Sequence, residues 1–198
     1  MTEQSPIYFF INKPYGVISQ FSGEPGEITL ANLFPFPKDV YPVGRLDKDS
    51  EGLLIITNDK ALTDRLLHPK NQHERTYHAQ VEGIPNEEDI QKLALGVSIS
   101  IDGKKYQTKP CRAKIIESAN TAERVPPIRV RKSIPTSWLE LNLIEGKNRQ
   151  VRKMTAAIGF PTLRLIRVSI ENLKLADLQN EICMRIDRES LYKKLNLR

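Results

Sequence analysis

Short apolar runs separated by polar, turn-forming segments predict a chain rich in strands. The continuous apolar run 52–57 (GLLIIT) has the length of a buried strand, and 75–83 (RTYHAQVEG) is rich in strand-forming residues. Asp102-Gly103 at the centre of VSISIDGKKYQT predicts a hairpin, because Asp-Gly suits a two-residue turn with positive φ. Further strands are expected at CRAKIIES, SWLELNLIEG and LRLIRVSI.

Helix signals are fewer and stand between these strands. Asn58 is expected to cap a short helix through DKALTDRLL, and Asn86 to cap one through EEDIQKLAL that ends at Gly96. GKNRQVRKMTAAIG predicts a third helix, closed by Gly159, and the basic segment SLYKKLNLR a helical end. Because hairpin signals dominate and strands do not alternate regularly with helices, the expected class is α+β, with a mixed, mainly antiparallel sheet and flanking helices.

Length and composition describe an ordinary globular chain. Its 198 residues suit one large domain or two small ones, and 39% of them are hydrophobic. The apolar runs are far shorter than the roughly 18 residues that a membrane span needs. The first residues, MTEQSPIYFFINKP, do not resemble a signal peptide, so the cytoplasm is the expected compartment and no membrane partner is expected.

The cysteines and histidines do not suggest a metal site. Cys111 and Cys183 lie far apart, form no CxxC pair and are expected to be core thiols. The three histidines have no partner at a recognised ligand spacing. We therefore expect no structural zinc and no bound metal.

The net charge of +6 and the pI near 9.3 favour a polyanionic partner. One basic segment is the third predicted helix, where Val151, Met154, Thr155 and Ile158 share a core face and leave Arg149, Arg152 and Lys153 on the other side. The second is a proline-containing loop, in which an extended arm is suited to follow a phosphate backbone. Its basic residues include Arg129, Arg131 and Lys132.

Three acids, Asp47, Asp49 and Glu51, stand within five residues in the segment YPVGRLDKDSEGLL. Paired carboxylates suit acid–base catalysis or a Mg²⁺ site, as in a nuclease, whereas the simpler interpretation is a solvated turn before the strand. Arg45 lies two residues before Asp47, and in an extended segment the two side chains point the same way. A neighbouring arginine favours the charged carboxylate that a nucleophile needs. Gly52 is expected to permit close backbone packing where the loop enters its strand.

Four stretches together resemble RNA pseudouridine synthases of the RsuA type. GRLDKDSEGLLIITND resembles their active-site motif, NKPYGVISQ their opening strand and turn, RTYHAQVEG their tyrosine-bearing strand, and EGKNRQVRKM their basic helix motif. The resemblance follows family order from residue 8 to about residue 175. It implies the synthase fold with an active-site cleft across the sheet, and cleavage of the uridine N1–C1′ bond, rotation of the base and rejoining through C5, without cofactor or metal.

The resemblance also assigns roles to particular residues. Asp47 corresponds to the catalytic aspartate, and Arg152 to its salt-bridge partner. Tyr77 corresponds to the tyrosine that stacks on the flipped uracil, and Arg45 to an arginine near the extruded nucleotide. The remaining expected RNA contacts are phosphate contacts of Lys147 and Arg149, joined by the basic loop residues named above.

The family resemblance sets the expected organisation and leaves alternatives. We expect residues 1–198 to form a single catalytic domain with two subdomains, without the N-terminal S4 domain of most RsuA-type members. This short form resembles members that modify large-subunit ribosomal RNA, and a monomer is expected. The alternatives are a non-catalytic RNA-binding protein that keeps the fold, a synthase for another ribosomal site, and a metal-dependent nuclease.

Overall fold

The structure is a computed structural model that describes residues 5–129, 131 and 133–197. The chain forms two compact units: residues 1–73 with 167–198 make the first unit, and residues 74–166 make the second. Strand β9 (Thr162–Ile170) contributes to both, since the boundary lies after residue 166. Lys132 lies outside the described residues.

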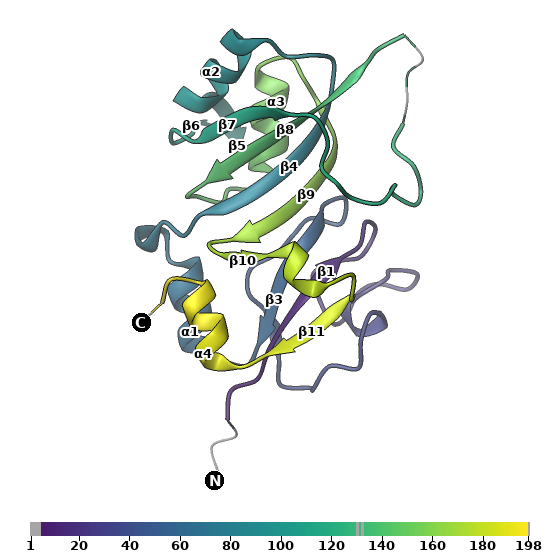
Figure 1. Ribbon diagram of the computed structural model, residues 1–198, viewed down its shortest axis with the longest axis vertical. Helices are drawn as coiled ribbons and strands as arrows, with labels where there is room; N and C mark the ends of the chain where they lie inside the picture. The colour runs from purple at the N-terminus through teal and green to yellow at the C-terminus, as the bar shows by residue number, and fades with distance from the viewer. Residues whose placement is uncertain (1–4, 130, 132, 198) are drawn as a thin grey trace. The chain divides into compact units, whose positions relative to one another are not determined.

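The strands of the first unit follow the order β11–β1–β3–β9 (Figure 1). The short strands β2 and β10 pair with β3 and β9, and β1 pairs antiparallel with both β3 and β11. The bounds are β1 Tyr8–Lys13, β2 Tyr41–Pro42, β3 Glu51–Thr57, β10 Leu173–Lys174 and β11 Cys183–Ile186, with helices α1 Lys60–Leu67 and α4 Arg188–Lys194 and 3-10 turns η1 Leu30–Asn32, η2 Pro69–Asn71 and η3 Leu175–Leu178.

Alternation along the strands of the first unit sends one set of side chains towards the two helices. Phe10 and Ile55 point to this face and belong to one buried cluster with Leu62 of α1 and Leu191 of α4. Figure 1 shows α1 beside α4. All seven residues of β3 are buried, because apolar or close-packed neighbours cover both of its faces.

The second unit has strand order β9–β4–β8–β7, and the β4–β8 and β7–β8 pairings are antiparallel. Ala79 and Leu139, on neighbouring strands, form a buried cluster with Leu93 and Met154 of the two helices. The helices therefore cover one sheet face, and the opposite face carries polar side chains. The bounds are β4 Arg75–Glu82, β5 Ser98–Ile101, β6 Lys104–Gln107, β7 Arg112–Ile116, β8 Thr136–Leu143, α2 Glu87–Leu95 and α3 Gln150–Ala157.

Most local predictions are confirmed, including the α+β class. The hairpin forms with Asp102 at φ 49° and Gly103 at φ 77°, as a turn with two positive φ angles requires. Asn86 caps α2 in a capping box. The α3 residues predicted to face the core are buried, except for the half-buried Ile158 after its end.

The predicted cap of α1 is wrong by one residue. Asp59 caps this helix, and its Oδ1 accepts the backbone N–H of Leu62 at 3.0 Å. The Oδ1 of Asn58 instead accepts the N–H of Ile7 at 2.8 Å, a contact across 51 positions. A long-range contact therefore takes the side chain that the local pattern assigned to the helix.

Candidate active site

The carboxylate loop runs between β2 and β3 of the first unit. It begins beside β3, where Val43 N–H donates to Ile55 O at 2.8 Å, and ends in a turn closed by Ser50 N–H on Asp47 O at 3.0 Å. Asp47 is half-buried and Arg45 is exposed. The turn that the simpler interpretation predicted is therefore present, but the carboxylate of Asp47, at its first position, is not fully exposed to water.

A second segment, residues 14–20, holds the loop from the side. The Oγ of Ser19 accepts the N–H of Leu46 at 3.0 Å and donates to Leu46 O at 2.7 Å. Gly16 N–H donates to Lys48 O at 2.8 Å. The residues on both sides of Asp47 are thus fixed by hydrogen bonds, so the backbone that presents its carboxylate has a defined position.

A fully buried cation, Lys13, lies at the end of β1. Its Nζ donates to Val17 O at 2.6 Å and to Pro14 O at 2.9 Å. Burial lowers the pKa of this ammonium to about 8, and the negative charges of Glu51, Asp49 and Asp47 oppose that shift. The acid loop therefore has a buried positive charge close enough to interact with all three of its carboxylates.

Sequence reasoning did not single out Lys13 or Ser19, although both lie in the quoted stretch NKPYGVISQ. A lysine that ends an otherwise apolar strand was an available signal, because lysine is almost never fully buried without partners. For Ser19 no local signal exists, since its partner Leu46 is 27 positions away.

Gly52 permits the close approach that the sequence predicted. Its φ is +103°, and a Cβ atom there would lie 2.3 Å from the carbonyl oxygen of Arg167. The side chain of Arg167, on β9, is buried, and its Nε donates to the carbonyl oxygen of Leu53, the next residue of β3, at 2.8 Å. The first residues of β3 after the acid loop are therefore packed directly against the backbone of β9.

The second unit holds Tyr77 and Arg152. Tyr77 lies on β4 opposite Leu141, is half-buried, and packs against the apolar cluster of that unit. Arg152 lies in α3, where its Nη1 donates to Thr162 O at 3.2 Å. The expected pair of Asp47 and Arg152 joins residues of both units and stays a prediction.

The segment before α3 is fixed by the side chain of Glu145. This carboxylate accepts hydrogen bonds from Tyr106 Oη at 2.5 Å and from Gln150 Nε2 at 2.6 Å, and the first of these raises the pKa of Tyr106 to about 12. The Nζ of Lys147 lies 5.1 Å from the centre of the Tyr106 ring. Arg149 is exposed in the left-handed conformation at φ 52°. Both expected phosphate-binding side chains therefore stand on an ordered turn.

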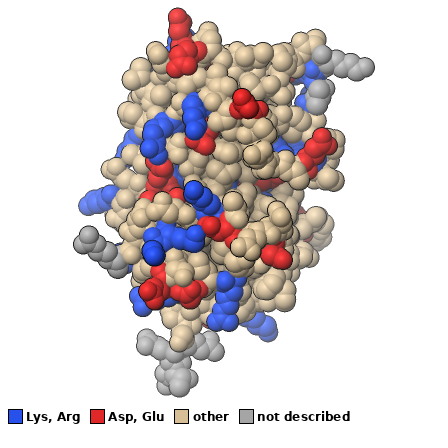
Figure 2. Space-filling view, viewed as in Figure 1, with Lys and Arg blue, Asp and Glu red and all other residues tan. Residues whose placement is uncertain are grey.

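Some residues of the basic loop between β7 and β8 contact strands of the second unit, to which the loop belongs. Arg129 is exposed, whereas Arg131 Nη1 lies 3.1 Å from Glu82 Oε1. Arg164 Nη1 donates to Ala122 O at 2.9 Å and ties the start of the loop to β9. On the surface visible in Figure 2, basic side chains are interspersed with acidic ones, so the net charge does not gather there as one block.

Three further features bear on the sequence predictions. Among residues 5–129, 131 and 133–197, no group of three or more His, Cys, Asp or Glu side chains is placed to hold a metal ion. Over the same described residues, none of the helices has the length and apolarity needed to cross a bilayer. Cys111 and Cys183 are half-buried free thiols, and burial raises the pKa of each to about 11.

Comparison with known proteins defines the class. Residues 7–157 match the family model described as RNA pseudouridylate synthase, and the chain belongs to this family. It is an RNA pseudouridine synthase, an enzyme of the isomerase class.

Particular relatives are similar over most of their length. The chain is 51% identical to ribosomal large subunit pseudouridine synthase E of Vibrio parahaemolyticus over 85% of this chain and 68% of that protein. It is 51% identical to the protein of the same name from Xanthomonas axonopodis pv. citri, over 83% of this chain and 86% of that protein. The fold matches a crystal structure of a pseudouridylate synthase with a TM-score of 0.77 and 26% identity, over 98% of this chain and 76% of that chain.

Proposed function

We propose that this enzyme converts a specific uridine of large-subunit (23S) ribosomal RNA to pseudouridine, with Asp47 as its catalytic residue. The names of its similar relatives support the RNA class. The observation that carries the assignment to Asp47 is the fixed loop: hydrogen bonds to Leu46 and Lys48 hold the backbone on both sides of this half-buried carboxylate.

The reaction is an isomerisation in which no atom is gained or lost. The N1–C1′ bond breaks, the uracil turns over, C5 bonds to C1′, and the proton that leaves C5 is balanced by the one that N1 takes up. Asp47 in its ionised form either attacks the sugar or removes a proton from it. Both routes require a carboxylate held close to the ribose, and the hydrogen bonds that fix the backbone around Asp47 support this role.

The uridine must leave its stack before either route begins. Extrusion costs a few kcal/mol, and stacking on an aromatic ring returns roughly 1–3 kcal/mol. In our proposal Tyr77 provides that ring and Arg45 lies near the extruded nucleotide. Arg152 pairs with Asp47 and keeps it charged, because a carboxylate removed from water without a cation takes up a proton.

The remaining proposed contacts position the RNA without reading its sequence. Lys147 and Arg149 bind phosphates from the ordered turn before α3, and Arg129, Arg131 and Lys132 do so from the basic loop. We further propose that the two units act together as one catalytic domain, as a monomer in the cytoplasm, without a cofactor.

The direct test is pseudouridine mapping of 23S ribosomal RNA from cells with and without this protein. We expect the loss of pseudouridine at one uridine, restored by the wild-type chain but not by Asp47→Asn. An unchanged map would contradict the proposal, and restoration by Asp47→Asn would favour a binding role without chemistry.

A further inference from the structure

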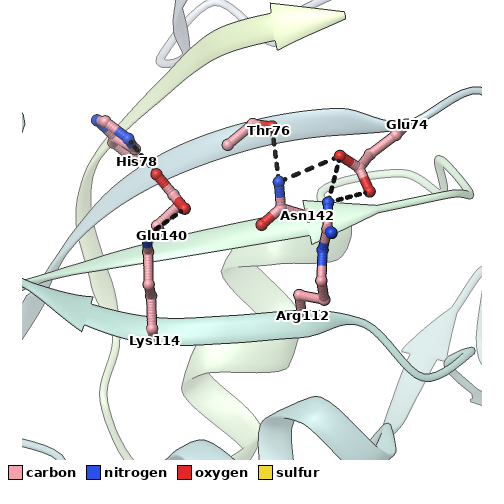
Figure 3. Close-up of polar contacts among 7 residues, drawn as sticks. All are labelled: Glu74, Thr76, His78, Arg112, Lys114, Glu140 and Asn142. Carbon is pink, nitrogen blue, oxygen red and sulfur yellow. Dashed lines mark hydrogen bonds and ion pairs between the residues drawn. The ribbon is translucent and has the colours of Figure 1, made fainter. Parts of the chain in front are cut away.

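The sheet face of the second unit that faces away from α2 and α3 carries ordered rows of polar side chains (Figure 3). In one row, Glu140 of β8 lies between His78 of β4 and Lys114 of β7 and bonds to both, at 3.1 Å and 3.0 Å. In the next row, Arg112 of β7 binds both carboxylate oxygens of Glu74 at 2.7 Å. The edge strand β7 thus supplies the cation of each row.

The charges on this face lie in two layers. The side chains of Arg112, Lys114 and Arg131 are 74%, 64% and 52% exposed. Their acidic partners are 34%, 23% and 17% exposed, in the same order. The carboxylates therefore lie against the sheet, and a molecule that approaches the face meets ammonium and guanidinium groups first.

The less exposed carboxylates also restrict the positions of the exposed cations that they bind. Burial opposes ionisation of Glu140, but hydrogen bonds from Lys114 and His78 lower the pKa of its carboxyl below its ordinary value. The Nζ of Lys114 lies 3.0 Å from this carboxylate, and the contact restricts the lysine side chain, so that less freedom is lost when it binds an anion. The Nη2 of Arg112 is held in the same way, because it lies 2.7 Å from both carboxylate oxygens of Glu74.

Spacing and continuity favour an extended polyanion as the partner. Lys114 and Arg112 are two positions apart on one strand, so their backbones are separated by roughly 7 Å, a spacing that suits successive phosphates of one strand. Arg131, which pairs with Glu82 on β4, connects the face to the basic loop. The outer groups are charged and not apolar, which separates this face from a hydrophobic protein interface.

We propose that this sheet face, through Lys114 and Arg112, binds the phosphate backbone of the substrate RNA outside the target nucleotide. The inference rests on the proposed function, since it assumes an RNA substrate. It adds β7 to the elements expected from the sequence to contact RNA, which were the carboxylate loop with Arg45, Tyr77 on β4, the basic loop and the segment around α3.

The test compares Lys114→Ala with Lys92→Ala in the full chain. Lys92 on α2 is a matched control, because it is 63% exposed and pairs with Asp89, an acid that is 17% exposed, on the side of the sheet covered by helices. Binding of a 23S ribosomal RNA fragment is measured over a range of salt concentrations. Trp138 is a built-in reporter, because the only tryptophan of the chain lies on β8 two residues before Glu140.

We expect Lys114→Ala to weaken binding several-fold and to reduce the slope of log K against log salt by about 0.7–0.9. Lys92→Ala should match the wild type, and saturating RNA should restore the full kcat of Lys114→Ala. An unchanged slope for Lys114→Ala, or an equal loss for both variants, would overturn the inference. A merely structural pair would change the melting temperature and leave the salt slope unaltered. If the wild type itself neither binds nor modifies the fragment, the proposed function fails as well.

Discussion

The hydroxyl group of Ser19 holds the backbone of Leu46 at both its N–H and its carbonyl oxygen, at 3.0 Å and 2.7 Å. A serine hydroxyl has one donor and accepts at its lone pairs, so a single side chain satisfies both buried groups. The residue held in this way immediately precedes Asp47. Fixing it restricts where the carboxylate of Asp47 can lie.

Ser19→Ala should therefore lower both stability and turnover. Two buried backbone groups lose their partner, which costs about 1–3 kcal/mol of unfolding free energy. We expect kcat to fall while RNA affinity is retained, as measured by urea unfolding and single-turnover kinetics. Ser137→Ala is the control, because Ser137 also donates to a backbone carbonyl, that of Gly83 at 2.6 Å. Equal kcat values for the two variants would show that Ser19 has only a structural role.

Gly52→Ala should be severely destabilising, because the new Cβ would meet Arg167 O at 2.3 Å in addition to the strain of a positive φ. The matched variant is Gly103→Ala, at φ +77° with no heavy atom within 4 Å of the added Cβ. Conformational strain alone costs about 1–2 kcal/mol, and a core clash typically adds about 1–3 kcal/mol. Thermal unfolding of both variants checks the difference, and equal costs would contradict the close approach.

The buried Lys13 should make stability depend on alkaline pH. Its pKa is about 8 in the folded chain and 10.5 for the free group, so between these values the unfolded chain binds more protons. The free energy of unfolding then rises with pH by up to about 1.4 kcal/mol per unit. This gain in stability is complete above the unfolded-state pKa of 10.5 and is lost as the pH falls through about 8.

Comparison with Lys13→Met isolates this effect. In urea unfolding from about pH 7.5 upwards, the free energy of unfolding of the wild type should rise relative to that of Lys13→Met as the pH increases. This holds whatever the stability of the variant at the lowest pH. Lys92→Met should run parallel to the wild type. A constant difference between wild type and Lys13→Met would mean that folding does not shift the pKa of Lys13.

Arg152→Ala should reduce activity by about 10²–10³-fold, the usual effect of removing one preorganised charge from an active site. The expected cause is the loss of the cation that keeps Asp47 ionised. Lys153→Ala, the next residue along α3, should change the rate little. An undiminished rate for Arg152→Ala would show that another cation serves Asp47.

The elements of this fold were predictable where local pattern decides them. The run 52–57, the Asp102-Gly103 turn and the core face of α3 each carry a signal within a few residues, and all three formed as expected. The short strand β11 gave no comparable signal, because it exists through its pairing with β1 far away in the chain.

The candidate site was likewise predictable only where the local sequence decides its structure. The motif places Asp47 on a loop before a buried strand, and the structure has that loop. What holds the loop was not predictable: Ser19 and Lys13 act through contacts with residues that only folding brings near. For the same reason a long-range contact of Asn58 moved the cap of α1 to Asp59.

In the proposed reaction, only one of the three loop acids, Asp47, does the chemistry. Pseudouridine formation in a 23S ribosomal RNA transcript should be measured for Asp47→Asn and Asp49→Asn side by side, with melting temperature and RNA affinity as controls. We predict that Asp47→Asn folds and binds RNA but forms no pseudouridine, whereas Asp49→Asn keeps most of its activity. Turnover by Asp47→Asn would contradict the assignment.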